Sequence, residues 1–125
     1  IYIHTVPHDE QRYDTAGDYW GDKRHKRIRV SKLSNSTYEF LIAMHELVEV
    51  HLTEKNGIRE RTILKFDMNK LEQKGDKYQY DPGADPKAPY HKEHMFAEKI
   101  EKALAKELGV DWKEYQAELD RLSHE

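Results

Sequence analysis

The segment from residue 36 to residue 56 constrains the fold most, because it predicts one long amphipathic helix. Ser36 and Glu39 have the spacing of a capping box, in which a hydroxyl and a carboxylate three residues later satisfy the first free N–H groups. Asn56 and Gly57 favour a left-handed stop. In between, apolar side chains recur at spacings of three and four residues and give the helix an apolar face: Phe40, Leu41, Met44, Leu47, Val48 and Leu52.

Shorter elements are predicted on both sides of this helix. Residues 1–6 are apolar and β-branched, and residues 27–33 alternate polar and apolar side chains, so both are predicted strands, with residues 18–20 as a hairpin partner. Helical spacing returns in residues 58–73 and 91–108, and a last helix starts at Asp111. Three prolines exclude a helix in residues 81–90. The sequence thus predicts an α+β fold, with a small antiparallel sheet packed against the central helix and two or three further helices.

Length and composition limit the classes of protein that this chain can belong to. A chain of 125 residues and 14.9 kDa is expected to form a single domain, residues 1–125. The net charge of -3 and the pI near 6.3 give no overall basic field, so nucleic acid is not an expected partner. No apolar run approaches the roughly 20 residues of a membrane span, so we expect a soluble protein without a membrane partner. Because Cys is absent, any metal must be held by His and carboxylate side chains.

The pentapeptide His45-Glu46-Leu47-Val48-Glu49 lies in the middle of the predicted central helix. His45 and Glu49 are four residues apart, so they share one helix face and can bind one metal ion together. Glu46 is turned by about 100° from His45, which suits the general base of a His-Glu-x-x-His helix. An ordinary ion pair between His45 and Glu49 on an exposed face is the alternative interpretation.

A catalytic metal site needs a third protein ligand and an open position. His91 and His94 are the candidates, because they begin the helix that follows the proline-rich segment. His45, Glu49 and His94 together form a two-His, one-Glu set that occurs in catalytic zinc sites and also suits non-haem iron(II). We expect zinc, with iron or manganese as the alternatives. His91 and His94 are otherwise loop-packing or surface residues.

The strand at residues 27–33 and the helix that carries His45 and Glu46 resemble the edge strand and active-site helix of minimal zincin metallopeptidases of the ImmA/IrrE type. Residues 93–98, with the sequence Glu93-His94-Met95-Phe96-Ala97-Glu98, resemble the second metal-binding helix of that family. The resemblance implies a zincin-like fold, Glu46 as base, and His45, Glu49 and His94 or Glu93 as ligands. Zincins have His at the position of Glu49, so either the ligands are permuted between the two helices or the peptidase chemistry is lost. The whole chain is also similar to small bacteriophage and prophage proteins with a His-Glu-Leu-Val-Glu helix.

Two functions follow from these features. The first is a zinc-dependent hydrolase with Glu46 as general base; the resemblance implies that it cleaves peptide or amide bonds in a peptide or protein substrate. The second is a non-catalytic phage or prophage accessory protein that keeps a zincin-like fold and binds a host protein. Both imply the cytoplasm of a bacterial host.

A basic stretch around His25 belongs to neither function; it consists of Lys23, Arg24, Lys26, Arg27 and Arg29. Such a stretch can contact phosphates or an acidic partner. Proteins that bind single-stranded nucleic acid interleave basic and aromatic residues, and this stretch has no aromatic residue. The sequence therefore favours a solvated hairpin tip.

Overall fold

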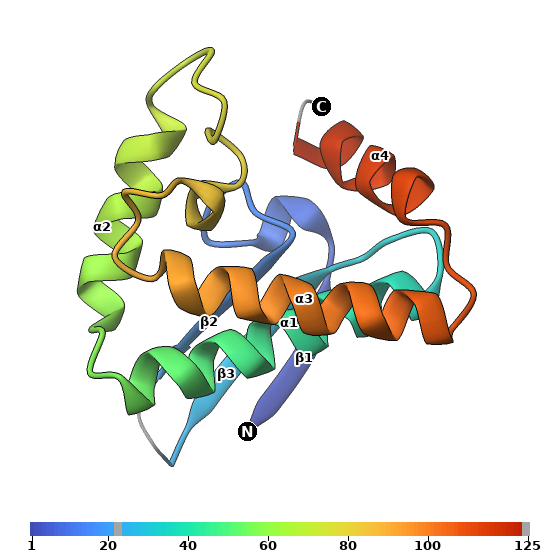
Figure 1. Cartoon of the computed structure of the whole chain (residues 1–125), viewed down its shortest axis with the longest axis horizontal. Coiled ribbons are helices and arrows are strands. Elements are labelled where there is room, and N and C mark those ends of the chain that lie inside the picture. Colours follow the sequence, from blue (N-terminus) through green and yellow to red (C-terminus); the bar gives the residue numbers. More distant parts are fainter. Residues whose placement is uncertain (22–23, 124–125) are drawn as a thin grey trace.

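The computed structural model describes residues 1–21 and 24–123, and in these residues it has four α-helices and one three-stranded sheet (Figure 1). The predicted α+β class is confirmed. The strands are β1 (Tyr2–Val6), β2 (Gly17–Gly21) and β3 (Lys26–Ser31), and the helices are α1 (Ser36–Lys55), α2 (Glu60–Leu71), α3 (His91–Glu107) and α4 (Trp112–Ser123). Two short 3-10 turns are η1 (His8–Glu10) and η2 (Pro82–Ala84). None of the described helices combines the length and the apolar character that crossing a membrane requires.

The sheet has the strand order β1-β3-β2 and mixed directions. β2 and β3 pair antiparallel, as predicted for the hairpin, whereas β1 pairs parallel with β3. The prediction of a purely antiparallel sheet is therefore wrong for β1. After Val6 the chain passes the C-terminal end of β3 and enters β2 on the far side of that strand. The alternation of polar and apolar residues determines which side chains face the core, but it does not determine a strand's neighbour or direction.

The helix boundaries agree with the prediction, but the cap of α1 differs. The side chain of Asn35, not Ser36, accepts a hydrogen bond from the Tyr38 N–H at 2.9 Å. The Glu39 carboxylate accepts from the Leu33 N–H at 2.8 Å instead of closing a capping box. Asn is as good an N-cap as Ser, so the cap is shifted by one residue. α1 ends where predicted, with Gly57 at φ +73.

The proline-rich segment is not fully extended, because Pro82 begins the 3-10 turn η2. The fixed φ of proline suits the first position of a helical turn. The prediction that this segment cannot be helical therefore holds for an α-helix but not for this single turn.

α1 is the central element of the fold. One side of it packs on β2 and β3. Another side packs along α3, and the two helices run in opposite directions side by side (Figure 1). Ile28, Val30 and Leu41 form the fully buried centre between sheet and helix. The contact between α1 and α3 places the middle of α1 opposite the first turns of α3.

Candidate metal centre

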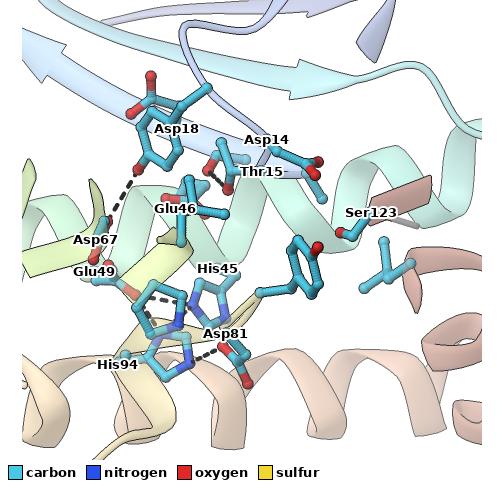
Figure 2. Close-up of a pocket in the computed structure, with 18 of the residues that line it drawn as sticks. Asp14, Thr15, Asp18, His45, Glu46, Glu49, Asp67, Asp81, His94 and Ser123 are labelled. Atoms are coloured by element: carbon cyan, nitrogen blue, oxygen red, sulfur yellow. Dashed lines mark hydrogen bonds and ion pairs between the residues drawn. The ribbon is translucent and has the colours of Figure 1, made fainter. Parts of the chain in front are cut away.

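Three of the predicted ligands meet where α1 and α3 pack together. His45 and Glu49 lie one turn apart on α1 and are 8% and 4% exposed, and His94 comes from the first turn of α3. Glu49 Oε2 lies 2.9 Å from both His45 Nε2 and His94 Nδ1, and the two ring nitrogens are 3.2 Å apart (Figure 2). These three atoms are close enough together to hold one metal ion. The ion pair between His45 and Glu49 that the sequence offers as an alternative is present, but it is buried and not on an exposed face.

Each histidine ring has a carboxylate on its outer nitrogen. His45 Nδ1 donates to Glu101 Oε1 at 2.6 Å, and His94 Nε2 donates to Asp81 Oδ1 at 3.0 Å. A histidine that donates from one nitrogen to a carboxylate is fixed in orientation and presents the lone pair of its other nitrogen. The inner nitrogens, His45 Nε2 and His94 Nδ1, therefore converge with Glu49 Oε2 on one point. This arrangement is typical of histidine ligands in metal sites.

The distances fit a small divalent cation. Ligand atoms bonded at about 2.0–2.1 Å in a tetrahedral site lie about 3.3 Å from one another. The observed separations of 2.9, 2.9 and 3.2 Å are shorter by only a few tenths of an ångström. Two nitrogens and one carboxylate oxygen suit zinc, and they also suit iron(II) and manganese(II).

Two tyrosines hold the outer oxygens of the carboxylates. Tyr19 on β2 donates from its hydroxyl to Glu49 Oε1 at 2.9 Å. Tyr115 on α4 donates to Glu101 Oε2 at 2.6 Å and is fully buried. The sheet, both central helices and the last helix therefore all contribute to the position of the three candidate ligands.

Burial, the carboxylates of Glu101 and Asp81, and the three groups themselves together determine the pKa values at this site. Burial lowers the pKa of His94, but hydrogen bonds to Asp81 and Glu49 outweigh it and raise that pKa to about 10. The pKa of His45 is likewise raised, by Glu101 and Glu49 against the effect of burial. Burial raises the pKa of Glu49, but the two histidines reverse this and lower it to about 2. The site thus favours negative charge on Glu49 and positive charge on the two histidine rings.

Glu46 points away from the three ligands, toward β2 (Figure 2). Its half-buried carboxyl forms no hydrogen bond or ion pair with any other residue that the structure describes. Burial, followed by the charge of Glu49, raises its pKa well above the ordinary value. Gly17 on β2 leaves space for this side chain, since a Cβ at Gly17 would lie 2.6 Å from Glu46 Oε1. Glu46 is therefore a carboxyl available to a ligand.

A cavity of about 430 Å³ opens beside this group, and its wall includes His45, Glu46, Glu49 and His94. Carboxylates reach the wall from β2 and from all four helices, including Asp18, Glu60, Asp67, Glu98 and Asp120. Of the described Lys and Arg residues, only Arg12 and Lys77 reach it. A cleft lined by one sign of charge attracts the opposite sign, so this cavity favours cations and cationic groups.

The remaining predicted residues lie outside the group. His91 Nδ1 lies 2.9 Å from the carbonyl oxygen of Gly83, so His91 binds the preceding loop. Glu93 accepts a hydrogen bond from the Asn56 side chain at 2.6 Å and joins α3 to the end of α1. Of the residues weighed for the third position, the structure therefore brings His94 to His45 and Glu49, but not His91 or Glu93.

Sequence reasoning missed the residues around the ligands. Glu101 carried a signal, because it lies at a spacing of four in the buried stripe of α3 with Glu93, Ala97 and Ala105, where a carboxylate needs a partner. Asp81, Tyr19 and Tyr115 are brought in only by tertiary packing. Gly83 was also missed: a Cβ there would lie 2.5 Å from His94 Nδ1, so only glycine allows the ring this position.

Comparison with known proteins adds no identification. No protein-family model matches the chain, and no curated protein or solved structure matches it either. The resemblance to minimal zincins therefore stays a prediction, and the function has to be argued from the geometry of the site.

Proposed function

We propose that this protein is a metal-dependent hydrolase that holds zinc between His45, Glu49 and His94. The observation that carries the proposal is the convergence of these ligands, with Glu101 and Asp81 on the outer nitrogens of the two rings, at the wall of a cavity. Iron(II) and manganese(II) are the alternative metals, because the same donor set accepts them.

Glu46 is the general base in this proposal. A divalent metal at the site supplies Lewis-acid activation of water and of a substrate carbonyl. Glu46 lines the same cavity and has no partner among the described residues, so its carboxylate can accept a proton from water and return it to the leaving group. Tyr19 and Glu101 hold Glu49 and His45 still during this exchange.

Peptide or amide bonds are the proposed substrates, acted on in the cytoplasm of a bacterial host. This part of the proposal comes from the resemblance to minimal zincins. The acidic wall adds that substrates with basic side chains are preferred, since the cavity attracts positive charge.

Metal analysis after purification without chelator tests the proposal. The wild-type protein should retain about one metal ion per chain, and His45→Ala, Glu49→Ala and His94→Ala should each lose it while remaining folded. His91→Ala is the matched control, because His91 binds Gly83 and should keep the metal. A wild-type protein with no metal, even after addition of zinc, contradicts the site.

Glu46→Gln then separates catalysis from binding. This variant should keep its metal and lose turnover of a peptide substrate, because the amide cannot accept the proton. If it keeps full biological activity, the hydrolase proposal is wrong and a protein that binds a host partner replaces it.

A further inference from the structure

The sheet has one face that α1 does not cover, and this outer face carries aromatic and basic side chains in register. Ile28 on β3 faces the core, so its neighbour Arg27 faces outward. Tyr2 on β1 and Trp20 on β2 are both paired with Arg27. Tyr2, Arg27 and Trp20 therefore form one row across the three strands.

The rings and guanidinium groups on this face are in contact. The Arg27 guanidinium lies 5.5 Å from the centre of the Tyr2 ring, and the Arg29 guanidinium lies 5.0 Å from the centre of the Trp20 ring. Neighbouring strands are about 4.8 Å apart, so the backbone positions of Tyr2 and Trp20 are about 10 Å apart, with Arg27 between them. The fold thus supplies the alternation of aromatic and basic groups that the basic stretch lacks along the sequence.

The charges of this face are available to a ligand. Arg12 also lies over Trp20, at 4.3 Å, but its guanidinium is bound to Asp18 at 2.6 and 3.0 Å. Arg27 and Arg29 have no carboxylate partner among the residues that the structure describes, and Arg29 donates only to a main-chain oxygen, that of Glu10. Tyr2 is 49% exposed and Arg27 is exposed.

We propose that the outer face of the sheet binds single-stranded nucleic acid. Arg27 and Arg29 pair with phosphates, and unpaired bases stack on Tyr2 and on the guanidinium planes that lie over Trp20. Aromatic rings and guanidinium planes can stack on bases that are unpaired and exposed. The bases of a duplex are already stacked on one another, so they are not available for this contact. The overall charge of -3 does not oppose this, because many acidic side chains gather at the cavity, and Asp18, which is paired across the strands with Arg29, is bound to Arg12. The proposal is independent of the hydrolase.

Binding of a fluorescein-labelled oligothymidylate, followed by fluorescence anisotropy at about 50 mM salt, tests the proposal. Arg27→Glu should weaken binding about tenfold or more, and Tyr2→Ala should weaken it several-fold, because each removes an exposed contact. Arg61→Glu on the exposed surface of α2 is the matched control: it makes the same change in charge and should leave binding unchanged.

Tryptophan fluorescence gives a second measurement, because electrostatic attraction alone does not change the emission of Trp20. In a Trp112→Phe background Trp20 is the remaining tryptophan, and stacking of bases should quench its emission. The proposal is wrong if no binding is seen at this salt concentration or if Arg61→Glu weakens binding as much as Arg27→Glu. It is also wrong if heparin and a duplex bind as tightly as the single strand without quenching, since that shows attraction for any polyanion.

Discussion

His45 and His94 face each other through ring nitrogens 3.2 Å apart, and the other nitrogen of each ring is bound to a carboxylate. Two N–H groups that point at each other across this distance repel, whereas two lone pairs that point at a shared cation do not. The carboxylates of Glu101 and Asp81 favour the second arrangement, because they accept the outer N–H groups. Without a metal, Glu49 Oε2 can accept both inner N–H groups; with these protons removed, the buried histidine pair could hold a metal ion together with Glu49.

Glu101→Gln should weaken zinc binding by about 10–100-fold, the usual cost of removing the carboxylate behind a histidine ligand. Gln keeps the size of the side chain but loses the charge that orients His45 and raises its basicity. Competition with a chromophoric chelator measures the affinity. Glu98→Gln is the control on the same helix, since Glu98 lines the cavity without contacting a ligand, and it should bind zinc as the wild type does. Equal loss in both variants contradicts the role of Glu101.

Gly83→Ala should lower both stability and zinc affinity, because the new Cβ would occupy space 2.5 Å from His94 Nδ1. The ring has to move away from Glu49, and the cost should be about 1–3 kcal/mol, as for other overpacked sites. Denaturation by urea measures the stability and chelator competition measures the affinity.

The same substitution in a His94→Ala background separates this clash from a general effect on the loop. Without the ring, the contacts at 2.4 and 2.5 Å are gone and only the contact with the Cβ of residue 94 at 2.8 Å remains, so Gly83→Ala should then cost less stability than in the wild type. If the two substitutions lower the free energy of unfolding additively, the cost of Gly83→Ala comes from the backbone of the loop and not from a clash with His94.

The sequence was sufficient to predict elements whose signals are local. Periodicity and end signals located α1, α3 and α4, and the i, i+4 spacing placed His45 and Glu49 on one face. The parallel pairing of β1 was not predictable, since the alternation along a strand is the same for either direction. Asp81, which binds His94, comes from the loop before α3, and Tyr115, which binds Glu101, comes from α4. No local sequence pattern predicts such contacts.

The raised pKa of Asp67 predicts how the free energy of unfolding changes with pH. It is 5% exposed and accepts hydrogen bonds from Tyr13 at 3.0 Å and Tyr90 at 2.5 Å. Burial raises its pKa from 3.8 to about 7, although the two tyrosine hydroxyls act in the opposite direction. Between these values the folded chain holds a proton that the unfolded chain has lost. The free energy of unfolding should therefore fall as pH rises through this window, by at most about 1.4 kcal/mol per pH unit from this group, and stay level above it.

Asp67→Asn should remove this contribution. An amide keeps polar contacts with both hydroxyls and has no proton to lose, so the variant should be more stable than the wild type above about pH 7 and no more stable at about pH 4. Urea denaturation of both proteins across this range measures the difference. A constant difference in the free energy of unfolding at every pH contradicts a raised pKa for Asp67.

The acidic wall of the cavity predicts a preference for positive charge in the substrate, on condition that the protein is a hydrolase. Carboxylates from β2 and all four helices line the cavity beside the candidate ligands, and Arg12, one of the two described Lys or Arg residues on the wall, is already bound to Asp18. Peptides with Lys or Arg beside the cleaved bond should therefore have a higher kcat/KM than peptides with Glu there, and added salt should reduce the difference.

Glu98→Gln should reduce this difference in kcat/KM several-fold without changing the metal content, because it removes one of the charges that the substrate meets. Glu107→Gln makes the same change on an exposed turn of α3 and should have no effect. Equal cleavage of both peptides by a protein that holds its metal means that the substrate bypasses the acidic wall.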